Sequence, residues 1–171
     1  DARLIALDAL DGSICESFAD NGMLHLEQGM PYNPAGYYYS TSPPVISEDR
    51  IIIGGAVNDN FSVKEPSGVI RAYDVHSGAL LWNWDSGNPD ETEPLPPGET
   101  YTANSPNSWS VFSVDDDLGL VYVPLGNATP DQLGMNRSEA VETYSAGIVA
   151  LDVQTGQHRW MRQFVHHDLW D

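Results

Sequence analysis

The stretch that decides the fold is Ile148-Val-Ala-Leu-Asp-Val-Gln-Thr-Gly156, with Trp160 four residues beyond its glycine. Two other segments align with it without gaps, Leu4-Ile-Ala-Leu-Asp-Ala-Leu-Asp-Gly12 and Ile70-Arg-Ala-Tyr-Asp-Val-His-Ser-Gly78. The shared frame is Ala-x-Asp-x-x-x-Gly. An internal repeat at this spacing predicts a fold built from similar units that pack on one another.

Each copy is predicted to form two strands joined by a tight turn. Apolar residues alternate up to the aspartate, whose side chain is suited to accept hydrogen bonds from turn amides, and the glycine allows a positive φ before the next strand. Trp82 stands at the same place after the second copy as Trp160 after the third, whereas the first copy has Glu16 there. We therefore expect one repeated hairpin with an altered first copy.

Two short apolar segments precede each of the later copies. They are Pro43–Ser47 and Ile51–Val57 before the second copy, and Trp109–Val114 and Leu120–Leu125 before the third. Four consecutive strands in a meander form the blade of a β-propeller. Only the stretch around Arg137–Glu142 suggests a helix. The sequence thus predicts an all-β chain of about two to three propeller blades.

We expect residues 1–171 to be a fragment of a single propeller domain, with repeats around residues 4–18, 43–85 and 109–164 and a further blade starting near residue 165. Two blades leave sheet faces and edges that a closed ring of blades would cover. The remaining blades of the parent chain are therefore the expected partner, and the fragment alone is expected to be inactive.

The charge balance excludes some kinds of partner. Seven Lys and Arg stand against 25 Asp and Glu, which gives a formal net charge of −18. Such a surface repels phosphate backbones and anionic lipid headgroups, so we expect no nucleic-acid partner and no polybasic membrane contact. No apolar run approaches the roughly 20 residues of a membrane-spanning helix.

The Ala-x-Asp-x-x-x-Gly-x-x-x-Trp repeat resembles the tryptophan-docking motif of the quinoprotein dehydrogenases, eight-bladed propellers that bind pyrroloquinoline quinone (PQQ) on their axis. In that family the tryptophan packs against the Ala and Gly of a neighbouring blade, which implies a structural role for Trp82 and Trp160. Further strings resemble the membrane-bound quinoprotein glucose dehydrogenase branch: Thr41-Ser-Pro-Pro44, Asn58-Asp-Asn60, Glu65-Pro-Ser-Gly-Val-Ile-Arg-Ala-Tyr-Asp74, Asn104-Ser-Pro-Asn-Ser-Trp109, Gly126-Asn-Ala-Thr-Pro-Asp131 and Val165-His-His-Asp-Leu-Trp-Asp171.

The resemblance implies a set of cofactor-binding residues. Trp109 matches the family's tryptophan that lies flat against PQQ, although its position also suits a core tryptophan on the first strand of a blade. Thr41 is a candidate donor to a cofactor carboxylate, or else a simple strand-start residue. Asn127 and Asp168 complete the expected cofactor-binding set.

A divalent cation is expected beside the cofactor. Ca²⁺ and Mg²⁺ prefer carboxylate and amide oxygens, and polar side chains follow two apolar segments, at Asn58-Asp-Asn60 and at Asn127. In the alcohol-oxidising relatives an acidic residue and an asparagine at these places bind calcium, which implies Asp59, Asn60 and Asn127 as ligands here. The Asn-Asp-Asn triplet also suits a turn, and the choice between Asp59 and Asn60 stays open.

The resemblance also implies the catalytic base. In the family this residue is the aspartate of a Trp-Asp pair after a His-Asp string, which is Asp171 here. A carboxylate there is placed to take the substrate's hydroxyl proton. Asp168 is a supporting candidate. His166 and His167 are adjacent, and adjacent strand residues point to opposite faces, so a rim or structural role suits them better than joint metal ligation.

These assignments imply a PQQ-dependent enzyme that oxidises an aldose, with glucose as the first candidate, to its lactone and passes electrons to ubiquinone. The resemblance places the parent protein on the periplasmic side of the bacterial inner membrane, with a membrane anchor outside this chain. One alternative is a PQQ-dependent alcohol or polyol dehydrogenase. Another is a non-catalytic propeller scaffold for outer-membrane assembly, which would need the tryptophan motif but not Asp59, Trp109, Asn127 and Asp171 together.

Overall fold

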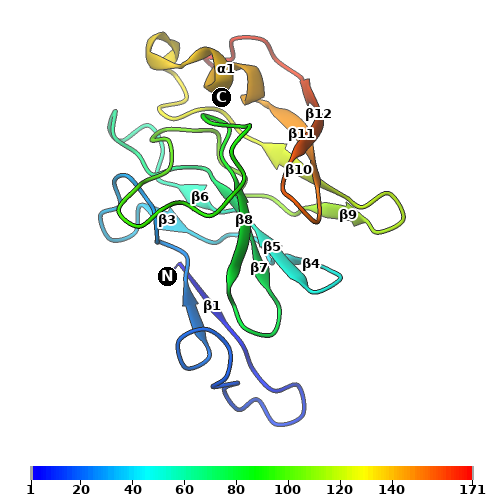
Figure 1. The fold of residues 1–171 in the computed structure, drawn as a ribbon. Helices are drawn as coiled ribbons and strands as arrows, with labels where there is room; N and C mark the ends of the chain where they lie inside the picture. Colours follow the sequence, from blue (N-terminus) through cyan, green and yellow to red (C-terminus); the bar gives the residue numbers. More distant parts are fainter. Residues whose placement is uncertain (1, 171) are drawn as a thin grey trace.

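The computed structural model describes residues 2–170, which are nearly all strand, turn and loop (Figure 1). Two antiparallel four-stranded sheets dominate. In the first, the strand order is β4 (Val45–Ser47), β5 (Arg50–Ile53), β7 (Ile70–Asp74) and β8 (Leu80–Trp84). In the second, it is β9 (Ser113–Asp115), β10 (Leu120–Leu125), β11 (Gly147–Asp152) and β12 (His158–Gln163). Each sheet is a meander, so the all-β expectation and its propeller blades are confirmed.

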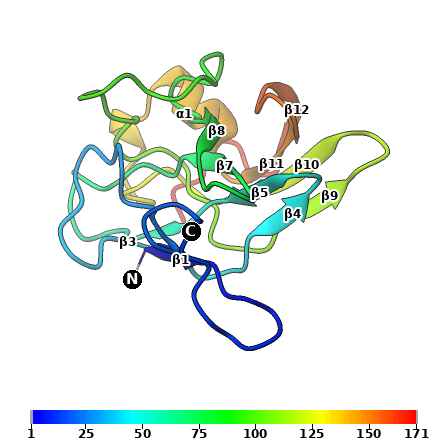
Figure 2. The ribbon, with the colours of Figure 1, turned by 60° about the horizontal axis from the view of Figure 1, so that its bottom comes forward.

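Two smaller sheets complete the fold. One pairs β1 (Arg3–Ile5) with β2 (Met23–His25), and the other pairs β3 (Tyr38–Tyr39) with β6 (Ala56–Val57). The innermost strands of the two blades, β4 and β9, contact each other and lie side by side in Figure 2. The chain therefore forms consecutive blades of a partial propeller.

A short helical insertion lies between β10 and β11. It holds a 3₁₀ turn (Gly134–Asn136) and α1 (Glu139–Tyr144), which packs on β12 and β11. Ser138 caps α1 by accepting a hydrogen bond from the Val141 amide, as serine does at many helix starts. The helix expected from the sequence is present, displaced toward the C-terminus.

The repeated aspartates and glycines build the same turn. In the second copy, Asp74 Oδ1 accepts from the Ser77 hydroxyl and amide, and Gly78 has φ +72°. In the third copy, Asp152 Oδ1 accepts from the Thr155 hydroxyl and amide, and Gly156 has φ +70°. The carboxylate thus satisfies turn amides that the strands leave unpaired.

Trp82 joins the two blades, as its motif predicts. Its indole Nε1 donates to the carbonyl of Val153 at 2.8 Å, and a Cβ placed on Gly156 would lie 2.5 Å from the indole Cε3. Only a glycine therefore lets the ring lie flat on the turn of the next blade. Trp160 is the equivalent residue of that blade and is 44% exposed.

The core lies between the blades around this tryptophan. Its fully buried members come from both four-stranded sheets and include Ile52, Ile70, Ala72, Trp84, Val121, Val123, Val149 and Leu151. In both hairpins the motif alanine lies directly opposite the tryptophan, Ala72 opposite Trp82 and Ala150 opposite Trp160. A small residue there leaves room for the indole.

The first copy uses Phe18 where the others use tryptophan. Glu16 is exposed, whereas Phe18 is buried and lies against Gly78 of the next blade. The Ala19 amide donates to the carbonyl of Ser77 at 2.9 Å. The contact between blades is kept, although the tryptophan position is not.

A buried guanidinium reinforces the same boundary. Arg71 of β7 is 1% exposed and donates to the carbonyls of Leu26, at 2.5 Å, and Gln28, at 3.2 Å. These carbonyls follow β2, so the arginine joins the β1–β2 sheet to the blade that contains β7. Three tyrosine rings surround the guanidinium carbon at 5.7 to 5.9 Å: Tyr38, Tyr73 and Tyr101. Ring faces and carbonyl oxygens thus stabilise the charge.

Two predicted strands are shorter than the sequence suggested. The expected strand Ile51–Val57 is divided by Gly54 and Gly55, because β6 leaves the blade to pair with β3. A Cβ on Gly55 would lie 2.5 Å from the Tyr38 ring. The expected strand Trp109–Val114 starts only at Ser113, which leaves Trp109 in the preceding loop.

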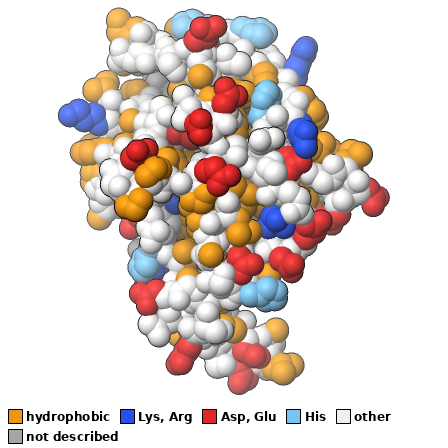
Figure 3. All heavy atoms as spheres, viewed as in Figure 1, with side chains coloured by type: hydrophobic (Ala, Val, Ile, Leu, Met, Phe, Trp, Pro, Cys, Tyr) orange, Lys and Arg blue, Asp and Glu red, His pale blue; other side chains and the backbone are white. Residues whose placement is uncertain are grey.

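The surface carries the acidic excess. Figure 3 shows red acidic side chains scattered over the face in view, with few blue basic ones among them. Within the described residues, no helix is long and apolar enough to cross a membrane.

We predict that Gly156→Ala destabilises the 171-residue chain more than Gly12→Ala. Both glycines have positive φ, +70° and +75°, so both substitutions carry backbone strain of about 1–2 kcal/mol. Only position 156 faces an indole, whereas nothing lies within 4 Å of a Cβ at position 12. Urea unfolding of both variants measures the difference in their free energies of unfolding. We expect this difference to be about 1–3 kcal/mol, the usual cost of overpacking. Equal losses would contradict the tight docking of Trp82.

The turn also predicts a titration. The Ser77 side-chain hydrogen bond, followed by the backbone amide bonds, holds the pKa of Asp74 below its ordinary value. The charged form is thus favoured in the folded state, so its contribution is present above the ordinary carboxyl pKa of about 4 and is lost as pH falls through the lowered value. Ser77→Ala should raise the pKa of Asp74 in an NMR pH titration. Thr155→Ala, as the control, should leave Asp74 unchanged and affect Asp152 instead.

Candidate functional site

Trp109 lies at the junction between the two blades. Its side chain is 57% exposed. Its carbonyl accepts hydrogen bonds from the hydroxyls of Thr41, at 2.5 Å, and Ser42, at 2.8 Å. Thr41 and Ser42 precede β4, and Trp109 precedes β9, so the entries to the two innermost strands are tied together. The indole is thereby presented on a fixed segment and not on the first strand of its blade.

Gly126 brings this segment against the end of β10. Its amide donates to the carbonyl of Asn107 at 2.9 Å. A Cβ on this glycine would lie 3.4 Å from Trp109 Nε1 and 3.5 Å from Asn107 Oδ1. The end of β10 therefore lies in van der Waals contact with the Asn107–Trp109 segment.

Asn107 is a site residue to which the sequence assigned no role. It is 3% exposed, and its Oδ1 is a buried acceptor without a hydrogen-bond partner. Buried acceptors of this kind are uncommon, and an ordered water, an ion or a ligand can satisfy them. Asn107 lies in the string Asn104-Ser-Pro-Asn-Ser-Trp109, which is part of the family resemblance. The resemblance assigns a role only to the tryptophan of this string.

Asn127 lies next to this segment and contacts the chain near the C-terminus. Its Nδ2 donates to the backbone carbonyl of Asp168 at 3.4 Å, and its Oδ1 is a second buried acceptor without a partner. Asp168 Oδ1 accepts from the Trp170 amide at 3.0 Å. The structure thus brings two predicted cofactor-binding residues together, with Asp168 taking part through its backbone.

The Asn58–Asn60 loop lies beside the insertion of the second blade. Asp59 is exposed, whereas Asn60 has φ +54° and donates through Nδ2 to Asp131 Oδ2 at 3.2 Å. Within residues 2–170, no hydrogen bond joins Asp59 or Asn60 to Asn127, and no group of three His, Cys, Asp or Glu side chains forms a metal cluster. Ligation of one cation by Asp59, Asn60 and Asn127 therefore stays a prediction.

The two histidines make separate contacts. His166 Nδ1 lies 2.8 Å from Gln163 Oε1, and His167 Nδ1 lies 3.3 Å from Glu142 Oε1. The two rings therefore contact different side chains, as expected for histidines that do not bind one metal together. Their role at the rim stays a prediction. Asp171, the predicted base, lies outside the described residues.

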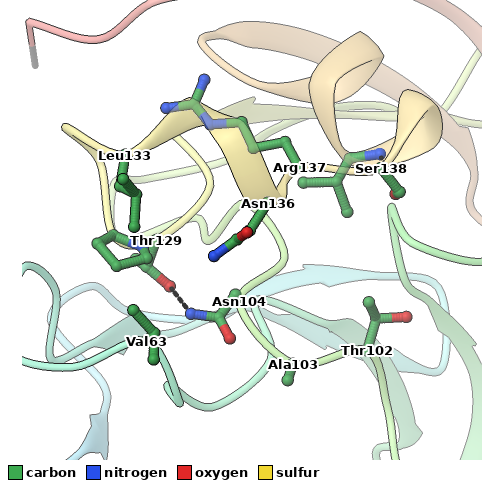
Figure 4. Close-up of a pocket in the computed structure, with 11 residues that line it drawn as sticks. Val63, Thr102, Ala103, Asn104, Thr129, Leu133, Asn136, Arg137 and Ser138 are labelled. Carbon is green, nitrogen blue, oxygen red and sulfur yellow. Dashed lines mark hydrogen bonds between the residues drawn. The ribbon is translucent and has the colours of Figure 1, made fainter.

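Two hollows border these segments. A small one is lined by Thr41, Gly54, Gly55, Ser108 and Phe112. A larger cavity of about 150 Å³ lies between the Asn104 segment and the helical insertion. In Figure 4, Asn104 Nδ2 donates to Thr129 Oγ1 at its floor, at 3.5 Å. None of the residues predicted to bind cofactor or metal lines this larger cavity.

Comparison with known proteins gives the family. Residues 1–171 match the family model described as "PQQ: Glucose/ethanol/alcohol dehydrogenase, beta-propeller domain". The chain belongs to this PQQ dehydrogenase family. It is 48% identical over 171 residues to quinoprotein glucose dehydrogenase of Escherichia coli (strain K12), covering 100% of this chain and 22% of the relative.

Other members of the family are also similar. The glycerol dehydrogenase large subunit of Gluconobacter oxydans (strain 621H) is 41% identical over 171 residues, covering 100% of this chain and 23% of the relative. The crystal structure of quinohemoprotein alcohol dehydrogenase from Comamonas testosteroni superposes with a TM-score of 0.75 at 26% identity, covering 100% of this chain and 26% of that chain. The chain thus spans about a quarter or less of these PQQ dehydrogenases.

The residues present fit a PQQ-type cofactor and an oxygen-binding cation. Trp109 offers an exposed aromatic face for a planar ring system, and the unpartnered Oδ1 atoms of Asn107 and Asn127 are buried oxygen acceptors beside it. Carboxamide oxygens are ligands that Ca²⁺ and Mg²⁺ accept. The predicted Thr41 bond to a cofactor carboxylate stays a prediction and requires its hydroxyl to leave the Trp109 carbonyl.

We predict that the double variant Thr41→Val, Ser42→Ala loosens the Trp109 segment. It removes both hydrogen bonds to the Trp109 carbonyl, each worth about 1 kcal/mol. Hydrogen-exchange mass spectrometry should show faster amide exchange in the peptide around Trp109. Thr143→Val, which removes a hydroxyl bond inside α1, is the control and should leave that peptide unchanged. Unchanged exchange in the double variant would show that the segment is held by other contacts.

Proposed function

We propose that the parent protein of this chain is a PQQ-dependent dehydrogenase that oxidises an aldose, with glucose as the first candidate, to its lactone. One observation carries the proposal: the whole chain is 48% identical to a protein named quinoprotein glucose dehydrogenase. The geometry supports it, because Trp109 and Asn127 lie on either side of Gly126 at the junction of the blades.

Trp109 is the residue that would bind the flat face of PQQ. Thr41 and Ser42 hold its backbone carbonyl, so the main chain that carries the indole is held before the cofactor arrives. An aromatic platform that is already in place costs less ordering on binding. When bound, PQQ supplies an acceptor for the hydride of the substrate.

Asn127 is the best-supported residue for the divalent cation, which we propose to be Ca²⁺ or Mg²⁺. Its Oδ1 is buried and unpartnered while its Nδ2 is held by the Asp168 carbonyl. The amide is therefore oriented with its oxygen available. Asp59 and Asn60 are proposed to add further oxygens from the neighbouring blade.

Asp171 is proposed as the general base. Its carboxylate would take the proton of the sugar's anomeric hydroxyl while the hydride leaves the same carbon, which gives the lactone. Asp168 lies three residues before it, and the Trp170 amide donates to the Asp168 carboxylate. This turn organises the chain immediately before the proposed base.

The remaining parts of the proposal concern the parent protein. We propose ubiquinone as its electron acceptor and the periplasmic side of the bacterial inner membrane as its location, with the other propeller blades as partners of this chain. The similarity to quinoprotein glucose dehydrogenases and the resemblance of the sequence strings to their membrane-bound branch support these assignments.

A polyol or alcohol dehydrogenase is the second candidate. It is favoured by the 41% identity to a glycerol dehydrogenase large subunit over the whole chain. The non-catalytic scaffold is not proposed, because the family matched by residues 1–171 is one of dehydrogenases. Dye reduction by the full-length protein with PQQ and Ca²⁺ decides between glucose and glycerol as substrate.

We predict that Asp171→Asn in the full-length protein lowers glucose-dependent dye reduction by about 10²- to 10⁴-fold, because an amide cannot accept the hydroxyl proton. PQQ binding, measured by tryptophan fluorescence quenching, should persist. Asp168→Asn is the control and should lose much less activity, since it keeps an oxygen for the Trp170 amide. Turnover unchanged in Asp171→Asn would reject this residue as the base.

A further inference from the structure

Asp131 connects the insertion of the second blade to the loop of the first. Its side chain is buried, at 3% exposure, and its Oδ2 accepts from Asn60 Nδ2 at 3.2 Å. The amide of the next residue, Gln132, donates to Asn60 Oδ1 at 3.5 Å. The Asn60 side chain is thus held at both ends by one short segment of the neighbouring blade.

Asn60 depends on this segment because its own loop gives it little support. It is exposed and has φ +54°, a conformation that asparagine tolerates better than most residues. Within residues 2–170, the hydrogen bonds given for its side chain all go to residues 131 and 132. The orientation of the amide is therefore set by the second blade.

Asp131 is itself fixed from the opposite side. The guanidinium of Arg137 donates to its backbone carbonyl at 2.7 Å and pairs with Glu142 of α1 at 3.2 Å. The Arg137 side chain is 4% exposed, and Figure 4 shows it in the segment between the 3₁₀ turn and α1. The segment that anchors Asn60 is thus held in turn by a partly buried ion pair.

The arrangement leaves acceptor capacity on the Asn60 oxygen. A carboxamide has one donor nitrogen and one acceptor oxygen with two lone pairs. Nδ2 donates to the Asp131 carboxylate, and Oδ1 accepts a long 3.5 Å contact from the Gln132 amide, which uses one of its lone pairs. Within residues 2–170 the second lone pair of Oδ1 accepts no hydrogen bond, and it is the one that a cation would use.

We infer that Asp131 is a positioning residue for the cation site, acting through Asn60. This inference rests on the proposed function, which makes Asn60 a cation ligand. Residues that orient metal ligands without touching the metal typically change metal affinity by 10- to 100-fold when replaced. Asp131 is the group in that position here, contributed by the blade next to the one that carries its ligand.

The test uses the full-length apo-protein and measures the Ca²⁺ concentration that gives half-maximal PQQ binding, followed by tryptophan fluorescence quenching. Asp131→Ala should raise this concentration about tenfold or more. Asp131→Asn keeps an oxygen within reach of Asn60 Nδ2 and should stay close to wild type. Asp116→Ala is the matched control, because Asp116 accepts the Ser47 hydroxyl across the same two blades at 2.6 Å. It should leave the Ca²⁺ dependence unchanged.

A double-mutant cycle separates positioning from general stabilisation. If Asp131 acts through Asn60, Asn60→Ala should raise the required Ca²⁺ concentration at least as much as Asp131→Ala does, and the double variant should be no weaker than Asn60→Ala alone. Additive losses, or an unchanged Ca²⁺ dependence in Asp131→Ala, would overturn the inference. So would an Asp131→Asn variant as weak as Asp131→Ala. Asp131→Ser, which is also too short to reach Asn60, replaces the alanine variant if the latter does not fold.

PQQ binding by the wild-type protein distinguishes a failure of the proposed function from a failure of the role inferred for Asp131. If it binds no PQQ at any Ca²⁺ concentration, the proposed function fails, and the role of Asp131 fails with it. If it binds PQQ in a Ca²⁺-dependent way while Asp131→Ala behaves like wild type, only the positioning role is lost.

Discussion

The contact of Trp82 with the turn of the next blade is the interaction on which the rest of the structure depends. It combines one hydrogen bond to the Val153 carbonyl with the close fit of an indole on Gly156. Two sheets that share no strand are set by it at a fixed angle and register. The segments before β4 and β9, which hold Thr41 and Trp109, inherit that placement. The geometry of the site is thus a product of packing in the core.

The sequence predicts the parts of the fold that depend on local pattern. The strand pairs, the Asp-to-Gly turns and the docking of Trp82 all follow from the repeat. Phe18 was not predicted, because the motif position is occupied by Glu16, and the substitute comes from a loop whose path no periodicity indicates. The break at Gly54 and Gly55 was also missed, since it arises where β6 pairs with β3 of another sheet and the Tyr38 ring of β3 packs against Gly55.

The candidate site also contains residues that the sequence predicts and residues that only the structure reveals. Trp109, Thr41 and Asn127 were expected from strings in the sequence, and the structure places Thr41 on the Trp109 carbonyl and Asn127 on the Asp168 carbonyl. Asn107 carries no distinguishing local pattern, and its unpartnered oxygen appears only when burial is known. Asp131 lies 71 residues from Asn60, so only the packing of one blade on the next reveals that they touch.

The buried Arg71 affects how pH and salt act on the boundary between the β1–β2 sheet and the blade that contains β7. The groups around its guanidinium are carbonyls and tyrosines, and no carboxylate contributes to its pKa. Burial raises the pKa of the neighbouring Tyr73 to about 12, so that ring stays neutral. Acid that protonates the many surface carboxylates therefore removes no partner of the Arg71 guanidinium, and dissolved salt screens a buried charge much less than an exposed one. In an otherwise acidic molecule, the Arg71 contacts depend little on pH and ionic strength.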